Sequence, residues 1–79
     1  MDTTKITALT GSQRQALVTA RDSYGLDVDI TQTTATFPQE PATAAALVTE
    51  AKDRWKMDGG TVSDTRPLAF AARKLLAQA

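Results

Sequence analysis

Residues 30–40 read ITQTTATFPQE, and the conformation of this stretch decides the fold. Apolar and acidic residues alternate immediately before it, in the order Leu26, Asp27, Val28, Asp29 and Ile30. This period of two is typical of a half-buried β-strand, and the threonines and Phe37 continue a composition that favours strands. Pro38 ends the run because proline has no N–H for a β-ladder. The segment 26–37 is predicted to form one long strand or two short ones, with a linker as the alternative.

Backbone pairing of this segment requires a second strand. A lone strand leaves its N–H and C=O groups unpaired, and no Asn-Gly or Asp-Gly pair marks a hairpin turn inside residues 26–37. The second strand must come from elsewhere, and a two-fold-related copy of the chain is an obvious donor. We therefore predict a homodimer in which the strand pairs across the interface.

One helix is predicted before the strand and another after it. A capping box at Ser12 and Gln15 predicts a first helix over residues 13–24, which Gly25 ends. A second helix is predicted over residues 41–57, because a proline begins it and two glycines follow it.

A third helix is predicted to begin at a cap residue between Thr61 and Thr65, which would place Pro67 in its first turn. Its apolar stripe consists of Leu68, Ala72, Leu75, Leu76 and Ala79. The predicted fold class is α+β and mostly helical: a helix, one strand, then two helices, with the strand pairing across a dimer.

The chain of 79 residues is predicted to be a single small domain, 1–79, with residues 1–11 as a candidate flexible N-terminus. It has no cysteine and no histidine, so thiolate and imidazole ligands and the usual general base are missing. A calcium loop starting at Asp27 fails, because Gln32 stands where a glycine is needed and Pro38 stands where a bidentate glutamate is needed. We expect no enzymatic activity, no cofactor and no metal site.

Charge and hydropathy limit the partners. Nine basic and nine acidic residues give a formal net charge of zero, which argues against binding nucleic acid through bulk electrostatics but leaves room for a local basic face. No stretch has the apolar length of a signal-peptide core or of a membrane span. We expect a cytoplasmic protein with no membrane partner, and its size suggests a bacterial or phage origin.

Two aromatic residues are candidates for contacts with another protein. Trp55 lies on the apolar stripe of the second predicted helix, so a core anchor is the first interpretation and an exposed interface anchor is the second. Phe70 falls on the side of the third helix opposite its apolar stripe, flanked by Arg73 and Lys74. It is either a lone exposed apolar side chain or a residue that another chain covers, and we favour the second interpretation.

The order of strand, proline, helix, glycine turn and capped helix resembles the ribbon-helix-helix family of small dimeric repressors and antitoxins. The likeness is carried by TQTTATFPQE (31–40), PATAAALVTEAKDRW (41–55) and GGTVSDTRPLAFAARKLLA (59–77). The resemblance implies an intertwined dimer whose two paired strands lie in the major groove of DNA.

The same resemblance implies particular DNA contacts. The outward side chains Gln32, Thr34 and Thr36 would touch base edges, and free N–H groups near Ser63 would hold a backbone phosphate. The inward side chains would be Thr33, Ala35 and Phe37.

Two functions follow as hypotheses, and both are non-enzymatic. The first is a dimeric DNA-binding transcriptional regulator that acts through the four DNA-contacting residues just named. The second is a small phage or mobile-element accessory protein that binds another protein, as an inhibitor or an assembly factor. Its interface residues would be Phe70, Arg73, Lys74 and Trp55.

Overall fold

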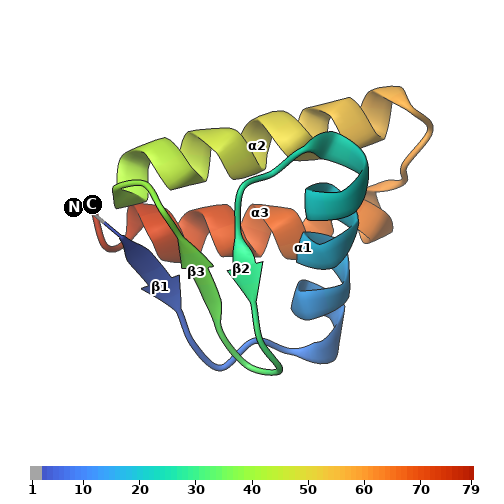
Figure 1. Ribbon diagram of the computed structural model, residues 1–79. Coiled ribbons are helices and arrows are strands. Elements are labelled where there is room, and N and C mark those ends of the chain that lie inside the picture. The colour runs from blue at the N-terminus through green and yellow to red at the C-terminus, as the bar shows by residue number, and fades with distance from the viewer. Residues whose placement is uncertain (1–2) are drawn as a thin grey trace.

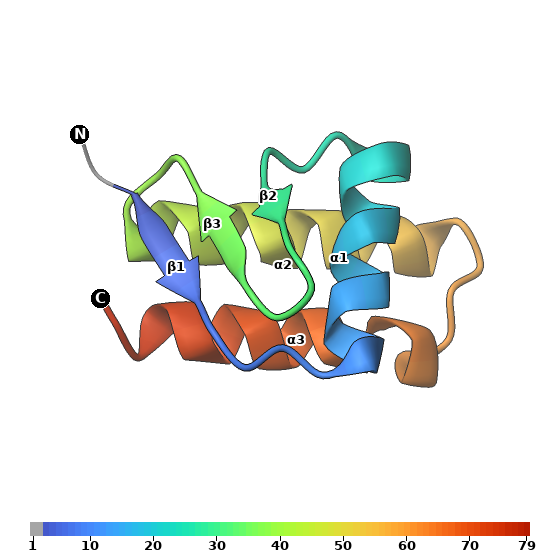
Figure 2. The same cartoon turned by 60° about the horizontal axis from the view of Figure 1, so that its bottom comes forward.

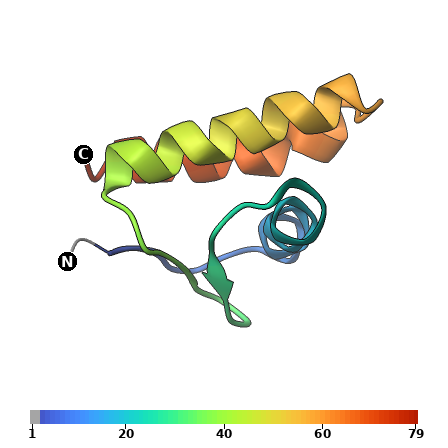
Figure 3. The ribbon, with the colours of Figure 1, turned by 45° about the horizontal axis from the view of Figure 1, so that its top comes forward.

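The computed structural model describes residues 3–79 as three helices and a small antiparallel sheet (Figure 1). The elements, in chain order, are β1 (Thr4–Ile6), α1 (Gly11–Tyr24), β2 (Asp29–Ile30), β3 (Ala35–Phe37), α2 (Pro41–Met57) and α3 (Val62–Leu76). The antiparallel pair α2 and α3 forms one layer, and the sheet with α1 forms the other (Figure 3). The fold is mostly helical α+β, as predicted. No helix within residues 3–79 is long and apolar enough to cross a membrane.

The sheet closes within the chain, because β3 is its central strand and both of its edges are occupied. On one side β1 pairs antiparallel with β3, so that Thr4 lies opposite Phe37 and Ile6 lies opposite Ala35. On the other side β2 pairs with β3, and Ile30 also lies opposite Ala35. The prediction that a second copy supplies the partner strand is therefore wrong. One partner strand lies near the N-terminus, in the segment that we expected to be flexible.

β2 and β3 form a hairpin, which the sequence prediction missed. The turn is held at both ends by threonine: Thr31 N donates to the Thr34 carbonyl oxygen at 2.8 Å, and the Thr31 hydroxyl accepts from Thr34 N at 3.2 Å. A threonine hydroxyl can stabilise a turn in this way without the Asn-Gly signal that marks the commonest hairpins. In addition, Leu9 N donates to the Thr33 carbonyl at 2.9 Å and ties the β1–α1 loop to the turn.

The hydrophobic core lies between the α2–α3 pair and the layer formed by the sheet and α1. Its largest fully buried side chains are Phe37, Leu17, Leu68, Leu75 and Val48. Ala35 and Phe37 point inward, as predicted. The prediction for Thr33 is wrong: this residue belongs to the turn rather than to a strand, and it is exposed.

α1 begins two residues earlier than predicted. Its cap is Thr10, whose hydroxyl accepts from Gln13 N at 3.1 Å while the Gln13 side-chain oxygen accepts from Thr10 N at 3.1 Å. The capping box is therefore Thr10 with Gln13, whereas Ser12 is an exposed residue of the helix. This earlier start lets Leu9 be buried immediately before the cap. Gly25 ends the helix in the left-handed conformation, with φ of 69°, as predicted.

α3 also begins at a capping box, formed by Thr61 and Asp64. The Asp64 carboxylate accepts from Thr61 N at 3.0 Å, and Asp64 N donates to the Thr61 hydroxyl at 3.1 Å. Because the helix starts at Val62, Pro67 is its sixth residue and lies in the second turn, so its predicted place in the first turn is wrong. The missing proline N–H leaves the carbonyl of Ser63 without its helical donor, and Ser63 is exposed, where water can serve that carbonyl.

Candidate functional site

A cleft separates the start of α1 from the first half of α3, two segments that lie close together in Figure 2. Its volume is about 340 Å³, and its lining residues are Thr10, Ser12, Gln13, Ser63, Arg66, Pro67 and Phe70. Phe70 and Pro67 are the apolar residues of this lining, and Phe70 keeps 45% of its surface exposed. The fold thus leaves a large aromatic side chain at the edge of a concave surface.

The α1 wall of this cleft is polar and fixed in place. Gln13 is buried, and its side-chain oxygen and backbone N–H are both engaged in the capping box with Thr10. Reciprocal hydrogen bonds of this kind hold both side chains in a single arrangement. A ligand entering the cleft would therefore meet a preformed polar wall on one side and Phe70 on the other.

The outward side of α3 carries three cations around Phe70. Arg66 lies four residues before Phe70, and Arg73 and Lys74 lie three and four residues after it. Side chains three and four residues apart are neighbours on one face of a helix. All three cationic side chains are exposed. We call the set Arg66, Phe70, Arg73 and Lys74 the Phe70 face.

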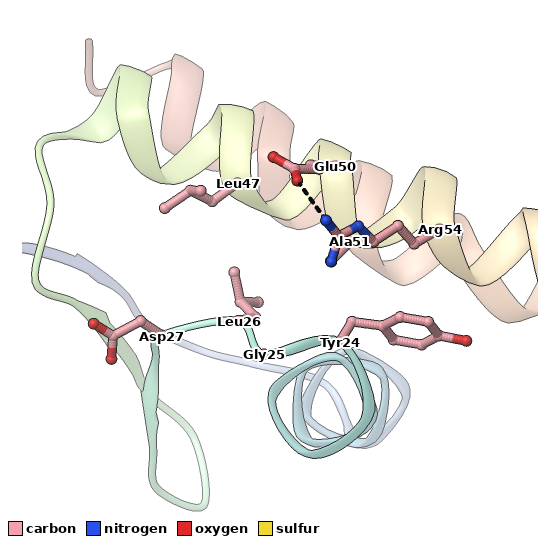
Figure 4. A pocket seen from close by; sticks show the side chains of 8 residues that line it. All are labelled: Tyr24, Gly25, Leu26, Asp27, Leu47, Glu50, Ala51 and Arg54. Atoms are coloured by element: carbon pink, nitrogen blue, oxygen red, sulfur yellow. Dashed lines mark ion pairs between the residues drawn. The ribbon is translucent and has the colours of Figure 1, made fainter.

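Figure 4 shows a second pocket, of about 230 Å³, between α2 and the loop that follows α1. Leu26 points from this loop toward α2, where Leu47 lies along the pocket wall. The charged residues that line this pocket are Asp27, from the loop, and Glu50 and Arg54, from α2, and the last two form an ion pair at 3.2 Å. The two charges on α2 satisfy each other, so the carboxylate of Asp27 is the charge that this pocket presents to a ligand.

The far end of α2 is tied to the end of α1 by two aromatic residues. Trp55 is half-buried and stacks on Tyr24, with ring centroids 6.3 Å apart. The Tyr24 hydroxyl donates to the Asp58 carboxylate at 3.0 Å. Desolvation raises the pKa of the Tyr24 phenol above its ordinary value, and the hydrogen bond and charge of Asp58 raise it further. This corner joins α1 to α2, and its charged residue, Asp58, lines neither of the two pockets described above.

The four residues predicted to contact DNA are not brought together. Gln32 is exposed in the β2–β3 turn, Thr34 is half-buried with its backbone bonded to Thr31, and Thr36 is half-buried on β3. Ser63 instead lines the cleft beside α1, to which none of the three hairpin residues contributes.

The predicted phosphate-binding N–H groups are also partly occupied. The Thr61 hydroxyl accepts from Asp64 N, and the Asp64 carboxylate is directed to Thr61 N at the same helix end. A carboxylate at this position would repel a phosphate. The helix N-terminus at Ser63 is therefore already capped by the chain's own anion.

The residues predicted to bind a protein are placed more coherently. Phe70, Arg73 and Lys74 share one face of α3, whereas Trp55 packs on Tyr24 and is absent from that face. Sequence reasoning missed Arg66, although its spacing of four residues from Phe70 was readable. It also missed the α1 wall of the cleft, because only the tertiary structure brings α1 to α3.

Comparisons with known proteins add no relative. No family model matches the chain, and neither the curated proteins nor the solved structures provide a match. Within residues 3–79, no group of three acidic side chains is placed to hold a metal ion.

Proposed function

We propose that this protein is a non-enzymatic binding module that recognises another protein through the cleft beside Phe70. The observation that carries this proposal is the position of Phe70, which stays 45% exposed on the rim of a concave surface. Aromatic and arginine side chains are the commonest energetic anchors of protein interfaces, and here an aromatic residue and Arg66 border the same cleft.

The size of the expected anchor can be estimated from exposure. A phenylalanine side chain has roughly 200 Å² of surface to bury, so the exposed 45% of Phe70 corresponds to about 90 Å². At roughly 25 cal/mol per Å², covering this surface contributes about 2 kcal/mol, or about 30-fold in affinity. That contribution reaches the range that defines an interface hot spot.

The test is a selection of random linear peptides displayed on phage against the immobilised protein. We expect enriched peptides whose affinity falls about 30-fold on the variant Phe70→Ala. The matched control is Leu76→Ala, which removes another exposed apolar side chain (56% exposed) from the same helix. Alanine has the highest helix propensity, so both variants keep α3 intact.

The comparison of the two variants separates specific binding at Phe70 from non-specific adsorption to exposed apolar side chains. Affinities that fall for Phe70→Ala and not for Leu76→Ala support the proposal. Peptides that bind Phe70→Ala as tightly as the unchanged chain, or a library that yields no Phe70-dependent binder, contradict it.

Binding to duplex DNA stays a prediction, and the same protein tests it. A low-salt mobility shift with a genomic fragment library, repeated with Gln32→Ala and Thr34→Ala, measures the expected base contacts. Light scattering measures the expected homodimer. A dimer formed through the Phe70 face would become a monomer in Phe70→Ala.

A further inference from the structure

The Phe70 face has a local excess of positive charge. After Asp64, α3 and the residues that follow it carry Arg66, Arg73 and Lys74 and no acidic side chain. The whole chain is neutral, with nine basic and nine acidic residues. The charge that balances these three cations therefore lies on other parts of the molecule.

None of the three cations forms an ion pair with another residue of the described range 3–79. Among residues 3–79 the ion pairs are Arg21 with Asp22 and Arg54 with Glu50, and neither involves α3. α2 offers a useful contrast, because acidic and basic residues are interleaved along it and one such pair is closed. The outward side of α3 lacks acidic residues that could neutralise it.

The helix dipole accounts for only part of this pattern. Arg73 and Lys74 lie in the last turn of α3, where a cation interacts favourably with the negative end of the helix. Arg66 lies in the second turn, near the positive end, where the dipole gives a cation no such stabilisation. Its exposed position beside the cleft and one turn from Phe70 is instead the arrangement expected of a contact residue.

We infer that the partner of this face is an acidic amphipathic peptide segment of another protein; this inference rests on the function proposed above. An apolar side chain of the segment enters the cleft and packs against Phe70. The volume of the cleft, about 340 Å³, lies at the lower end of the range of ligand pockets. Carboxylates on either side of that apolar residue lie opposite Arg66 at one end and Arg73 and Lys74 at the other. Complementary charge of this kind fixes the register of the segment and speeds its association.

Other occupants fit the charges less well. A second copy of the chain, docked by two-fold symmetry, would bring the same cations close to themselves, which is repulsive. Duplex DNA gains affinity from many released counterions, and a neutral chain with three clustered cations supplies few such contacts. An acidic peptide with a few carboxylates, by contrast, can be bound by the three cations of this face.

The experiment starts from peptides that bind the unchanged chain in a Phe70-dependent way. Each peptide is synthesised as selected and again with every Asp and Glu replaced by Asn and Gln. We expect the amide forms to bind about tenfold more weakly at low ionic strength, as three exposed ion pairs predict. We also expect the difference to shrink when the salt concentration is raised to about 0.5 M.

A matched pair of charge variants locates the effect on the protein. Arg73→Gln and Lys56→Gln each remove an exposed cation from the last turn of a helix, in α3 and α2 respectively. We expect Arg73→Gln to weaken the acidic peptides about two- to fivefold and the amide forms not at all. Lys56→Gln should leave both forms unchanged.

Each contrary result has a distinct meaning. Amide forms that bind as tightly as the acidic forms overturn the acidic partner and leave the Phe70-dependent function standing. A library without any Phe70-dependent peptide overturns both. Tighter binding of a short duplex DNA, or of phosphatidylcholine vesicles containing phosphatidylserine, that is lost in Arg73→Gln assigns the cations to phosphate groups and overturns the inference. A dimer that Phe70→Ala dissociates assigns the face to a second copy and overturns it as well.

Discussion

The substitution Gly60→Ala tests how tightly the α2–α3 turn is packed on Trp55. Gly60 N donates to the Trp55 carbonyl oxygen at 2.9 Å, which holds the turn against the last turns of α2. A Cβ atom built on Gly60 would lie 2.7 Å from Trp55 Nε1 and 2.9 Å from the Trp55 carbonyl oxygen, and closer still to Cδ1. These distances are shorter than any ordinary carbon contact, so the indole ring or the turn must move.

The expected magnitude follows from two opposing terms. Overpacking of this kind destabilises a protein by about 1–3 kcal/mol, and a displaced Trp55 also loses its stacking on Tyr24. Replacing glycine by alanine restricts the unfolded chain and returns about 0.4–1 kcal/mol. The net expectation is a loss of about 1–2 kcal/mol in the free energy of unfolding, or roughly 4–16 °C in Tm for a domain of this size.

Gly11→Ala is the matched control and should act in the opposite direction. Gly11 is the first residue of α1, and apart from its chain neighbours and the nearby backbone of α1 no atom of residues 3–79 lies within 4 Å of the position of its added Cβ. Alanine there should raise the free energy of unfolding by about 0.4–1 kcal/mol.

Urea unfolding followed by fluorescence measures both variants, because Trp55 is the only tryptophan and reports on its own surroundings. We expect Gly60→Ala to lower stability and to change the native emission of Trp55. A Gly60→Ala variant as stable as the unchanged protein, with the same native emission, would refute the reasoning.

Three further substitutions test other parts of the fold by the same unfolding assay. Ala8→Gly should raise the free energy of unfolding by about 0.5 kcal/mol, because relief of the left-handed backbone at Ala8, with φ of 55°, is worth about 1–2 kcal/mol and the greater freedom of glycine in the unfolded chain costs about 0.4–1 kcal/mol; a clear loss of stability would contradict strain at this residue. Thr10→Ala should cost about 1 kcal/mol through loss of the helix cap, whereas Ser12→Ala should change stability little; the reverse order would place the cap at Ser12. The hydrogen bond from Tyr24 to Asp58 requires a protonated phenol with a raised pKa, so its stabilisation is fully present below the ordinary tyrosine pKa of about 10 and is lost as the pH rises through the higher folded value. The stability difference between the unchanged protein and Tyr24→Phe should therefore be constant below about pH 9 and shrink above about pH 10; a difference that stays constant through alkaline pH would count against the bond.

The helices were readable from the sequence because their signals are local. Each signal spans only a few neighbouring positions: apolar residues at helical spacing, a proline at the start of a helix such as Pro41, or a glycine at its end such as Gly25. These signals located three helices to within two or three residues. The caps were harder to place. Thr10 with Gln13 and Ser12 with Gln15 have the same spacing, and the burial of Leu9 before the cap, which distinguishes them, is a tertiary effect.

The pairing of β1 with β3 was not readable from the sequence because it is non-local. β1 is three residues long and pairs with β3 across about thirty intervening residues, with Thr4 opposite Phe37. The hairpin turn at residues 31–34 is stabilised by the Thr31 hydroxyl rather than by the glycine that hairpin prediction relies on. Because neither β1 nor the hairpin was expected, a second copy was an obvious source of a partner strand, and this led to the prediction of a strand that pairs across a dimer.

Only the part of the candidate site that lies on α3 could be predicted from the sequence, because the other part depends on a contact between segments distant in the chain. Phe70, Arg73 and Lys74 form a pattern within one helix, so spacing alone placed them on one face. The cleft that gives Phe70 its setting depends on the contact of α1 with α3. Chain positions near Thr10 and Gln13 carried no sign of that contact.

The most direct measurement of the central claim is the site that a bound peptide occupies on the protein. Backbone amide NMR spectra recorded during titration with a Phe70-dependent peptide report this position residue by residue. Binding at the Phe70 face predicts that the shifted amides cluster at Thr10, Gln13, Arg66 and Phe70, on the two walls of the cleft. Shifts concentrated instead around Glu50 and Arg54, or at the β2–β3 turn, would contradict it.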